Sequence, residues 1–463
     1  MPSDCHFVDT RASFPCYLPR GMSATTVNRL LLLPLLGRLF VALLAISTAT
    51  AALAPAAARA DIRVWEENED DIWHHRWFAF TGFAQPGFIY RQNDPENAIS
   101  DDHFWLQRAR FGFRAQLHRY IQLRFEIEGM PSPNLTDVFV DLPFHPAFSI
   151  RVGQFLLPFL RTYQINEANQ AFIDRLIYTP QQPDRFALRY LNPRDVGMMF
   201  TGIIGNTDPE VMSPGLQYWA GVFLGRGANQ IVNDDNAFLY SARVNFHVLG
   251  PPKGADQESD LANNENPHVA AGAGIYTNCD DRGNYNRGMT FDSEFRYRGL
   301  YAYASFVRFY NGAVRNDSLG KFLGYGGSCG GGIAGASDSI AWGASLQVQY
   351  VLPTMLFPIP DQALEVLARF DAVAPLNPAD GSFLGGGVSS VGYAPPPDYR
   401  DADNPPTRWR LTFGLNWFPT HDQLIRLSLN YQLNRETENA IIAGREFIGV
   451  KNDTLWLQGT VGF

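Results

Sequence analysis

Residues that would point to several common protein classes are scarce in this chain. Of its 463 residues, only three are lysines (Lys253, Lys321 and Lys451) and only four are cysteines. Past the first 60 residues there is no run of 18 or more apolar residues, which excludes a transmembrane helix there. A membrane protein without such a run satisfies its backbone by closing a β-barrel. An exported soluble protein would also lack one.

The first 60 residues have the composition of an export signal. Met22 is followed by an apolar stretch over residues 30–54 and then by the sequence Ala58-Arg59-Ala60. A charged start, an apolar centre and a small-x-small end are typical of a secretory signal peptide. A single transmembrane helix is the competing interpretation, and Arg38 inside the apolar stretch argues against it. We expect residues 1–60, an upstream extension plus the signal, to be removed, with Met22 as the true start.

The mature chain is predicted to be acidic. Removing residues 1–60 takes away five of the 37 basic residues and two of the 46 acidic ones, which leaves 32 against 44 and a net charge of −12. A chain this acidic is no general nucleic-acid binder. Cys279 and Cys329 remain after cleavage, both in predicted outer loops. A disulfide between them is one interpretation, and two free thiols are the other.

Alternation of apolar and polar residues is the main structural signal. Successive side chains of a strand point to opposite faces. In residues 104–117 one face is predicted to carry Trp105, Ala109, Phe111, Phe113, Ala115 and Leu117, and the other Arg108, Arg110, Gly112, Arg114 and Gln116. Residues 121–128 repeat the pattern after a tight connection at His118-Arg119. In a barrel the charged face lines the lumen.

The pattern recurs about sixteen times, an even number and a size that leaves an aqueous channel. The last predicted strand, residues 454–463, is apolar on one face and mostly small or polar on the other, as expected for a closing strand. The predicted strands lie near residues 76–88, 104–117, 121–128, 135–142, 148–155, 196–204, 216–224, 238–246, 268–276, 289–297, 300–309, 341–352, 364–374, 408–417, 425–433 and 454–463. The sequence predicts one barrel domain over residues 76–463, after a short periplasmic segment at residues 61–75.

Connection lengths alternate between short and long, as a barrel with a periplasmic N-terminus requires. Residues 249–267 break this rule and are predicted to form a flexible turn. The longest connection is the third outer one, about residues 156–195. A loop this long is usually functional or disordered, and we expect it to fold into the lumen and narrow the pore.

Several segments resemble the phosphate-selective porin O/P family. The most specific is Val152-Gly153-Gln154-Phe155 followed by Pro158-Phe159, with Asn166–Arg175 (N-E-A-N-Q-A-F-I-D-R) after it. Arg108–Ala115 and Phe413–Pro419 are similar to further parts of that family. The resemblance implies a sixteen-stranded trimeric porin of the outer membrane, with the third loop in the lumen and an anion path lined by basic side chains. One departure is that the family's constriction lysines are missing here, and Leu156 follows Gln154-Phe155.

Arginines are therefore the candidate pore-lining and anion-binding residues. The guanidinium group is a rigid fork of donors that suits phosphate and carboxylate. On the strands the alternative is pairing with Glu126, Glu128 and neighbouring acids, and in the loop it is salt bridges that hold the loop's fold. The candidates are Arg108, Arg110, Arg114 and Arg124 on the strands, and Arg161, Arg175, Arg185 and Arg189 in the third loop.

The sequence predicts an outer-membrane channel for small hydrophilic solutes with a possible anion bias, and not an enzyme. A structural or adhesive barrel is the alternative, and a barrel-type hydrolase is a weaker one, since no nucleophile, base and orienting group stand out. No cofactor or metal site is predicted, and His74-His75 is interpreted as a solvated pair. The expected partners are outer-membrane lipid, small anionic or hydrophilic solutes and two further copies of the chain in a homotrimer.

Overall fold

The computed structural model describes residues 62–67, 76–91, 102–130, 133–179, 193–233, 237–279, 285–312, 339–353, 355–374, 408–436, 440–442, 445–447 and 453–463. They belong to one compact unit, Ala54–Phe463. Among these residues no helix is long and apolar enough to cross a membrane. The disulfide-bonded Cys279 ends a strand, whereas Cys329 lies outside the described residues, so the predicted pairing of the two stays a prediction.

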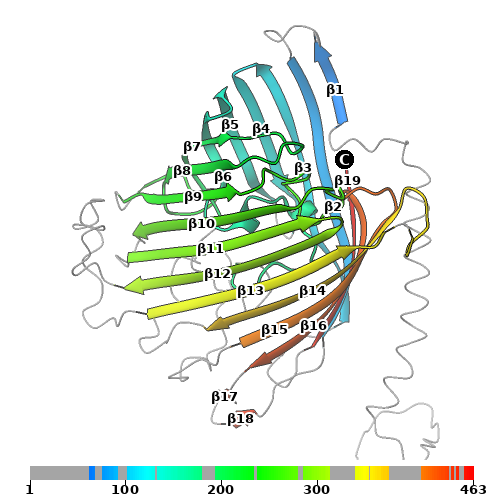
Figure 1. Ribbon diagram of the computed structural model, residues 1–463. Helices are drawn as coiled ribbons and strands as arrows, with labels where there is room; N and C mark the ends of the chain where they lie inside the picture. Colours follow the sequence, from blue (N-terminus) through cyan, green and yellow to red (C-terminus); the bar gives the residue numbers. More distant parts are fainter. Residues whose placement is uncertain are drawn as a thin grey trace, which may run out of the picture. The chain divides into compact units, whose positions relative to one another are not determined.

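Sixteen antiparallel strands, each hydrogen-bonded to its neighbours in sequence order, form a closed barrel (Figure 1). They are β2 (Arg76–Arg91), β3 (Asp102–His118), β4 (Ile121–Glu128), β5 (Asn134–His145), β6 (Phe148–Leu156), β7 (Arg194–Gly205), β8 (Gly215–Phe223), β9 (Leu239–His247), β10 (His268–Cys279), β11 (Tyr285–Tyr297), β12 (Leu300–Gly312), β13 (Ser339–Val351), β14 (Ala363–Ala374), β15 (Arg408–Phe418), β16 (Ile425–Glu436) and β19 (Thr454–Gly462). All sixteen predicted strands are confirmed, with ends that differ by a few residues.

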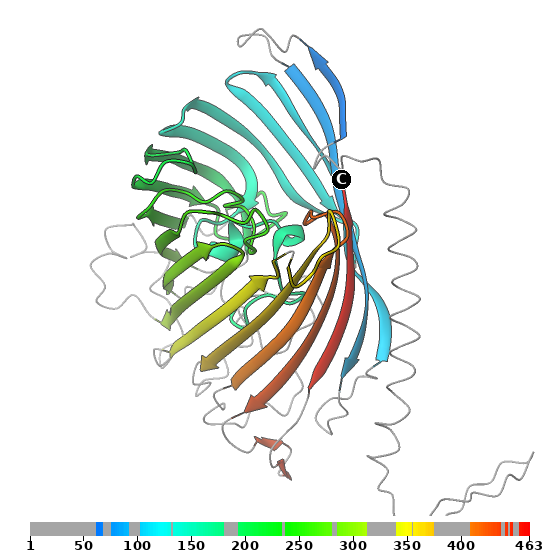
Figure 2. The same ribbon diagram turned by 45° about the vertical axis from the view of Figure 1, so that its right-hand side comes forward.

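The last strand closes the ring. β19 pairs with β16 along one edge and with β2 along the other. Beyond β19, the amide of Phe463 donates to the carbonyl of Gly82 at 2.9 Å, and the amide of Gly82 donates to the carbonyl of Phe463 at 3.0 Å. The first and last barrel strands are thereby joined, as Figure 2 shows, and a closed barrel leaves no strand edge unpaired.

The two faces of the barrel differ in polarity as the alternation predicts. Side chains of one parity are large, apolar and exposed, among them Phe111, Phe291, Leu346 and Phe413. Side chains of the other parity are polar or charged and buried, among them Arg243, Arg369 and Asn430. Because the strands close on themselves, the polar face is inside and the apolar face outside. An outward apolar belt around a polar interior is the arrangement that a lipid bilayer requires of a barrel.

One residue was assigned to the wrong face. Trp105 was predicted to face outward with Phe111, but its ring lies 5.1 Å from that of Trp456 and packs with the buried Ile89 and Ile173. The reason is a register shift in the β2–β3 pair, between the partners of Ala84 and Pro86. An extra residue in one strand reverses the parity of every residue beyond it.

Three short strands were not predicted. β1 (Ile62–Glu67) lies in the segment before the barrel and pairs with the start of β2, from Arg76 to Phe80. β17 (Ala440–Ile442) and β18 (Arg445–Phe447) form a separate hairpin in the last long connection. Three-residue strands carry too little alternation to be recognised from sequence.

Most connections at one end of the barrel are short, and we call this the short-turn end. Three of them have two residues, and in one of these, Arg298-Gly299 between β11 and β12, φ is 47° and 83°. Two positive φ values in a two-residue loop are those of a type I′ turn, whose twist matches that of the strands. The other end carries the long connections and is called the long-loop end.

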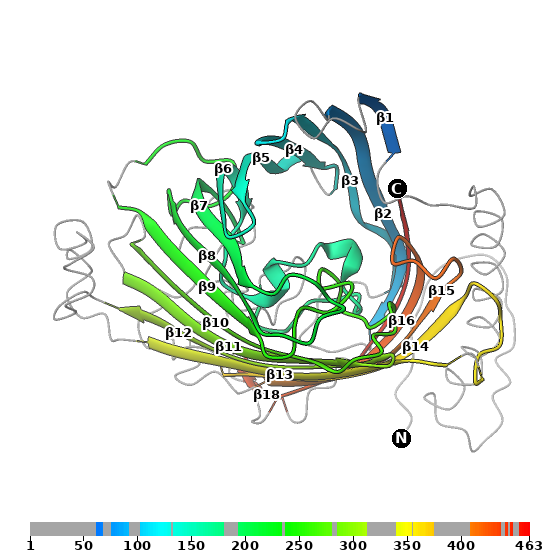
Figure 3. The same cartoon turned by 45° about the horizontal axis from the view of Figure 1, so that its top comes forward.

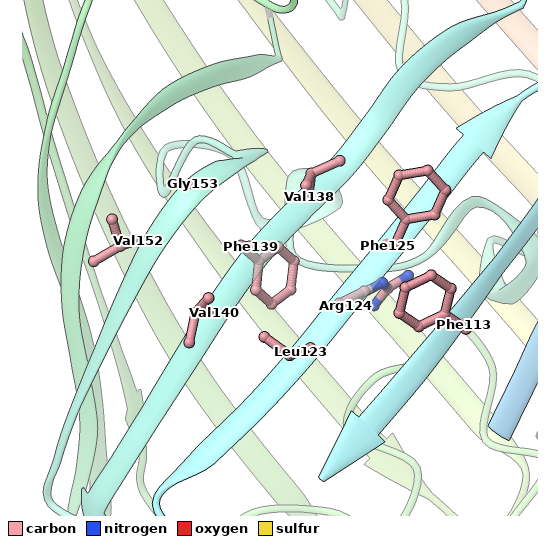
Figure 4. A pocket seen from close by; sticks show the side chains of 9 residues that line it. All are labelled: Phe113, Leu123, Arg124, Phe125, Val138, Phe139, Val140, Val152 and Gly153. Atoms are coloured by element: carbon pink, nitrogen blue, oxygen red, sulfur yellow. The ribbon is translucent and has the colours of Figure 1, made fainter. Parts of the chain in front are cut away.

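A shallow groove of about 350 Å³ lies on β3–β6 (Figure 4). Most of its lining is apolar and of the outward parity: Phe113, Leu123, Phe125, Val138, Val140 and Val152. Gly153 borders it with a φ of 135°, in the region that favours glycine. A Cβ there would lie 2.2 Å from the carbonyl oxygen of Val138. The backbone of β6 can therefore approach β5 only because residue 153 has no side chain.

Replacing Gly153 by alanine is expected to prevent most of the protein molecules from closing into a barrel. The unfavourable φ alone costs about 1–3 kcal/mol, and the contact with Val138 adds to it. The measurement is the fraction of refolded protein that migrates differently in SDS gels before and after boiling. Gly459→Ala is the matched control, because a Cβ at residue 459 of β19 would meet nothing closer than 4.0 Å. Equal folded fractions for the two variants would contradict this explanation.

Candidate functional site

The candidate site is the inward face of the barrel together with the chain between β6 and β7. Residues 157–179 of this chain, here called the β6–β7 segment, contain the 3-10 turns η1 (Arg161–Tyr163) and η2 (Glu167–Asn169). All but three of the segment's residues are buried. The side chain of Asn166 caps η2 by accepting from the amide of Ala168 at 3.1 Å. Figure 3 draws these turns within the ring of strands.

Apolar side chains hold one side of the β6–β7 segment against the wall. Phe159 packs edge-on against Tyr276 of β10 at 4.9 Å between ring centroids, and it also contacts Phe309 of β12. Leu160, Tyr163 and other side chains of the segment belong to the same buried cluster. Buried aromatic pairs add about 0.5–1.5 kcal/mol each beyond their area, so the segment is packed as firmly as a protein core.

Buried arginines of the wall donate to main-chain carbonyls of the segment. Arg243 of β9 donates to Phe159 O at 3.1 Å. Arg369 of β14 donates to the carbonyls of Asp174 and Arg175 at 2.9 Å each, and Arg410 of β15 also donates to the latter at 2.7 Å. Arg243 pairs as well with Asp292 of β11, and both Arg369 and Arg410 pair with Asp371 of β14. Their donors are used to hold the chain and are not offered to a solute.

Neutral amides complete the attachment. Asn430 of β16 accepts from the amide of Ile173 at 2.8 Å, and Asn416 of β15 donates to the carbonyl of Ala171 at 2.9 Å. Gln107 of β3, another strand of the wall, donates to the carbonyl of Ile173 at 3.3 Å. A buried backbone group needs a partner, and here the strands supply partners where the segment has no secondary structure of its own.

Glu167 in η2 is the centre of a buried ion cluster. Its carboxylate pairs with Arg110 of β3 and with Arg175 of its own segment, and Arg194 of β7 lies 3.7 Å away. Arg110 pairs in addition with Glu126 and Glu128 of β4. The cluster ties the β6–β7 segment to β3 and β7 by ion pairs, in addition to its apolar contacts with the wall.

Glu167 is expected to stay ionised in mildly acidic solution. Burial alone would raise the pKa of this carboxyl, but Arg110, Arg175 and Arg194 hold the pKa well below its ordinary value of 4.5. Because the pKa is lowered, the ionised Glu167 carboxylate stabilises the folded protein above about pH 4.5. This stabilisation is lost as the pH falls through the lowered pKa. In planar-bilayer recordings of the ion current through the barrel, the difference in current noise between wild type and Glu167→Gln should therefore be the same at about pH 7 and pH 5. A difference that disappears between these two pH values would contradict the assignment.

The predicted arginines separate into two groups. Arg110, Arg161 and Arg175 are buried and ion-paired, Arg161 with Glu294 of β11 at 3.3 Å. They match the alternative in which acids balance the arginines and salt bridges hold the loop. Arg108, Arg114 and Arg124 are only partly buried. Arg185 and Arg189 lie outside the described residues.

The partly buried arginines face the lumen from β3 and β4. Arg114 stands directly opposite Arg124 across the β3–β4 pair. The side chain of Arg124 is 23% exposed and pairs with Glu126 at 3.1 Å and with Asp137 at 3.7 Å. A further one, Arg151 of β6, is 29% exposed, pairs with Asp141, and lies 4.0 Å from the centre of the Phe139 ring. Arg151 was not among the arginines predicted from the sequence.

The connection between β9 and β10, residues 248–267, differs from its prediction. It was expected to be a flexible turn, but Ser259, Asp260, Leu261 and Asn264 are buried. Arg296 of β11, which is fully buried, donates to the carbonyls of residues 254, 257 and 259 at 2.7, 2.6 and 3.0 Å. Proline and polar residues suggested mobility, yet the polar groups find partners on the inward wall. We call this chain the β9–β10 segment.

No family model matches the sequence, and no curated protein matches it significantly. Among solved structures, the barrel is similar to an anion-selective porin from Comamonas acidovorans, with 10% identity and a TM-score of 0.48 over 84% of this chain and 100% of that one. It is also similar to the outer-membrane channel DcaP of Acinetobacter baumannii, with 12% identity and a TM-score of 0.48 over 84% and 97%. A third similar structure is OmpF of Salmonella typhi, with 12% identity and a TM-score of 0.47 over 86% of this chain and 100% of that one.

Similarities at this level of identity and TM-score carry no argument about function. The architecture rests on the strand pairing itself, and the resemblance to the phosphate-selective porin O/P family stays a prediction. Within the described ranges, no group of three or more His, Cys, Asp or Glu side chains could hold a metal ion.

Proposed function

We propose that this protein is a porin of the bacterial outer membrane, which lets small hydrophilic solutes diffuse through its barrel. The observation that carries the proposal is the inverted polarity of the closed barrel, with apolar side chains outside and arginines, acids and amides inside. Such an interior suits water-soluble cargo and such an exterior suits acyl chains. A sixteen-stranded barrel has room for an aqueous path in addition to a folded segment.

The β6–β7 segment is the proposed constriction. It is anchored to strands on both sides of the ring, through Arg369 and Arg410 on one side and through Arg110 and Arg194 on the other. A segment fixed at so many points keeps one position, so the width of the path is set by structure and not by fluctuation. A pore selects by such width together with the fixed charge along its wall.

An anion preference is proposed from the charge of the partly buried inward side chains. Arg108, Arg114, Arg124 and Arg151 outnumber Asp141 on this part of β3–β6. Arg124 and Arg151 are paired with acids, as the buried arginines are, but their side chains keep 23% and 29% of their surface exposed. Guanidinium groups that stay partly hydrated attract anions without binding them so tightly that conduction stops.

Phosphate as a preferred solute and a homotrimer as the assembly are finer proposals that come from the family resemblance. The wall offers guanidinium forks, which suit phosphate geometrically, although the lysines typical of that family are missing. The solved structures named above include an anion-selective porin, and an outer-membrane protein of Vibrio cholerae with a similar barrel was solved in a trimer form.

The test is a planar-bilayer recording of the refolded protein in a KCl gradient, with phosphate titrated against the chloride current. The proposal expects stable ohmic conductance and a reversal potential displaced toward that of chloride, and block by phosphate would support the finer proposal. A strong cation preference would reject the anion preference and leave the porin intact. No conductance from folded protein would favour the structural or adhesive barrel, and a positive lipid-hydrolysis assay would favour the hydrolase.

A further inference from the structure

We propose that the β9–β10 segment is a second constricting element, which docks onto the β6–β7 segment so that the two together cover the inward wall of β9–β16 and confine solutes to the side lined by β3–β8. The inference rests on the proposed function as a channel. It assigns the route of the solute and gives a role to a connection that the usual pattern of short turns does not explain.

The two segments contact each other directly. The amide of Glu258 donates to the carbonyl of Asn169 at 3.0 Å, and the carboxylate of Glu258 accepts from the amide of Ala171 at 3.3 Å. The side chain of Asn169 donates to both the carbonyl and the carboxylate of Asp256 at 3.3 Å. Arg161 donates to the carbonyl of Ala255. Three residues within 255–258, namely Ala255, Asp256 and Glu258, thus contact η1, η2 and the chain that follows, and form a joint between the two segments.

The β9–β10 segment is fixed to the wall independently of this joint. Besides the three bonds from Arg296, the carboxylate of Asp260 accepts from the amide of Gly299 at 2.7 Å. The side chain of His421, in the β15–β16 turn, contacts the carbonyl of Leu261 at 3.1 Å. Ser259 donates to Glu365 of β14 at 2.7 Å. The segment therefore reaches from β9 across the short-turn end to β14 and β15.

The exposure of inward side chains differs between the two sides of the lumen. This is the difference expected if the two docked segments form a partition that covers one wall and leaves the other open. On β9–β16, the inward charged and amide side chains are buried: Arg243, Asn245, His247, Asp292, Glu294, Arg296, Gln347, Gln349, Glu365, Arg369, Asp371, Arg410, Asn416, Arg426, Asn430 and Gln432. On β3–β8, many inward side chains remain partly exposed: Arg114, Gln116, Gln122, Arg124, Asp141, Arg151, Thr201, Gln217 and Trp219.

This asymmetry has a direct consequence for selectivity. Water and solute can reach only the side where the partly buried arginines lie, so every ion passes close to Arg114, Arg124 and Arg151. Charge acts strongly over a short distance and is screened beyond about 8–10 Å in physiological salt. A path confined to one side therefore makes a few arginines effective for the whole current. Without the partition, ions could pass along the opposite wall, where Arg243, Arg369 and Arg410 are buried and held by carboxylates and main-chain carbonyls.

The experiment removes the β9–β10 segment and keeps the strands that it joins. The amide of Val248 already donates to the carbonyl of Val269 at 2.8 Å, so residues 249–268, which include the first residue of β10, can be replaced by a two-residue Asn-Gly turn, which suits a hairpin. The folded variant is expected to conduct about twofold more than wild type and to lose most of its chloride preference, because the wider path bypasses the arginines. The matched control replaces residues 206–214, another connection at the short-turn end, by the same turn. It removes an exposed ion pair with the β9–β10 segment, Glu210 with Lys253, and leaves the buried anchors of that segment in place, so it should change neither quantity.

A second variant keeps the result interpretable if the deletion fails to fold. Arg296→Met removes three anchors of the segment and keeps its length, and it should raise current noise and lower chloride preference in protein that still shifts in SDS gels on boiling. If wild type conducts and both variants have wild-type conductance and selectivity, the partition is refuted and the porin stands. If the barrel folds and wild type does not conduct, the proposed function itself fails.

Discussion

Replacing Glu167 by glutamine is expected to loosen the β6–β7 segment and to increase chloride preference at the same time. Glu167 is buried and is the only acid of the segment shared by Arg110, Arg175 and Arg194. Removing one partner of a buried ion pair typically costs about 3–5 kcal/mol, because the remaining charges have no compensation. Arg110 keeps Glu126 and Glu128, and Arg194 keeps Asp137, so the largest loss falls on Arg175. Its guanidinium group can recover hydration only if the segment moves away from its present position.

The measurement for Glu167→Gln is a bilayer recording of current noise and reversal potential. We expect frequent transitions between conductance levels and a reversal potential closer to that of chloride, because one negative charge is lost beside three arginines. Glu210→Gln is the control, since Glu210 pairs with Lys253 in an exposed position where a salt bridge contributes little. Quiet currents with unchanged selectivity in Glu167→Gln would contradict the role given to this cluster.

The second large effect is expected for Arg114 and Arg124. These two residues face each other directly across β3 and β4, and like charges in that position destabilise a sheet. Arg124 also pairs with Glu126 and Asp137, but each of these acids keeps a second arginine partner, Arg110 or Arg194. We therefore expect Arg114→Gln with Arg124→Gln to leave thermal stability unchanged or higher while chloride preference falls several-fold, since both groups lie on the proposed path.

Reversal potential and melting temperature are measured on the same preparations of this double variant. Its control is Arg369→Gln, which removes a buried arginine that holds two carbonyls of the β6–β7 segment. That control should lower the melting temperature, because the buried carbonyls lose their partners. If the double variant is destabilised and its selectivity is that of wild type, Arg114 and Arg124 are structural residues and not part of the path.

The strands could be predicted because their signal is local. In residues 425–433, Leu427 and Leu429 alternate with Ser428 and Asn430, and each face needs only its own neighbours to be recognised. The same local rule failed at Trp105. A register shift there depends on how β3 meets β2, and nothing within β3 alone announces it.

The arrangement inside the barrel could be predicted only in part. The pairing of Arg110 with Glu126 and Glu128 was foreseen as an alternative, because all three lie on the same face of neighbouring strands. The roles of Arg369 and Arg410 were not foreseen. Their partners are main-chain carbonyls 194 and 235 residues away, and a carbonyl has no signature in a sequence.

The β9–β10 segment was mistaken for a flexible turn for the same reason. Its composition of proline, aspartate and asparagine is that of a loop, and loops of this kind are usually exposed. Buried Asp260 is satisfied by the amide of Gly299, and buried Ser259 by Glu365. Only the three-dimensional neighbours of a polar residue decide whether it is solvated or fixed.

The most direct test of the account is thiol labelling at two adjacent positions of β3 during a current recording. Arg114 faces the proposed water-filled path, and Phe113 borders the outward groove. A charged, membrane-impermeant thiol reagent should reduce the current through Arg114→Cys and leave the current through Phe113→Cys and wild type unchanged. Block at residue 113 and not at residue 114, or no block at either in a conducting barrel, would contradict a path along the arginine-bearing side of the lumen.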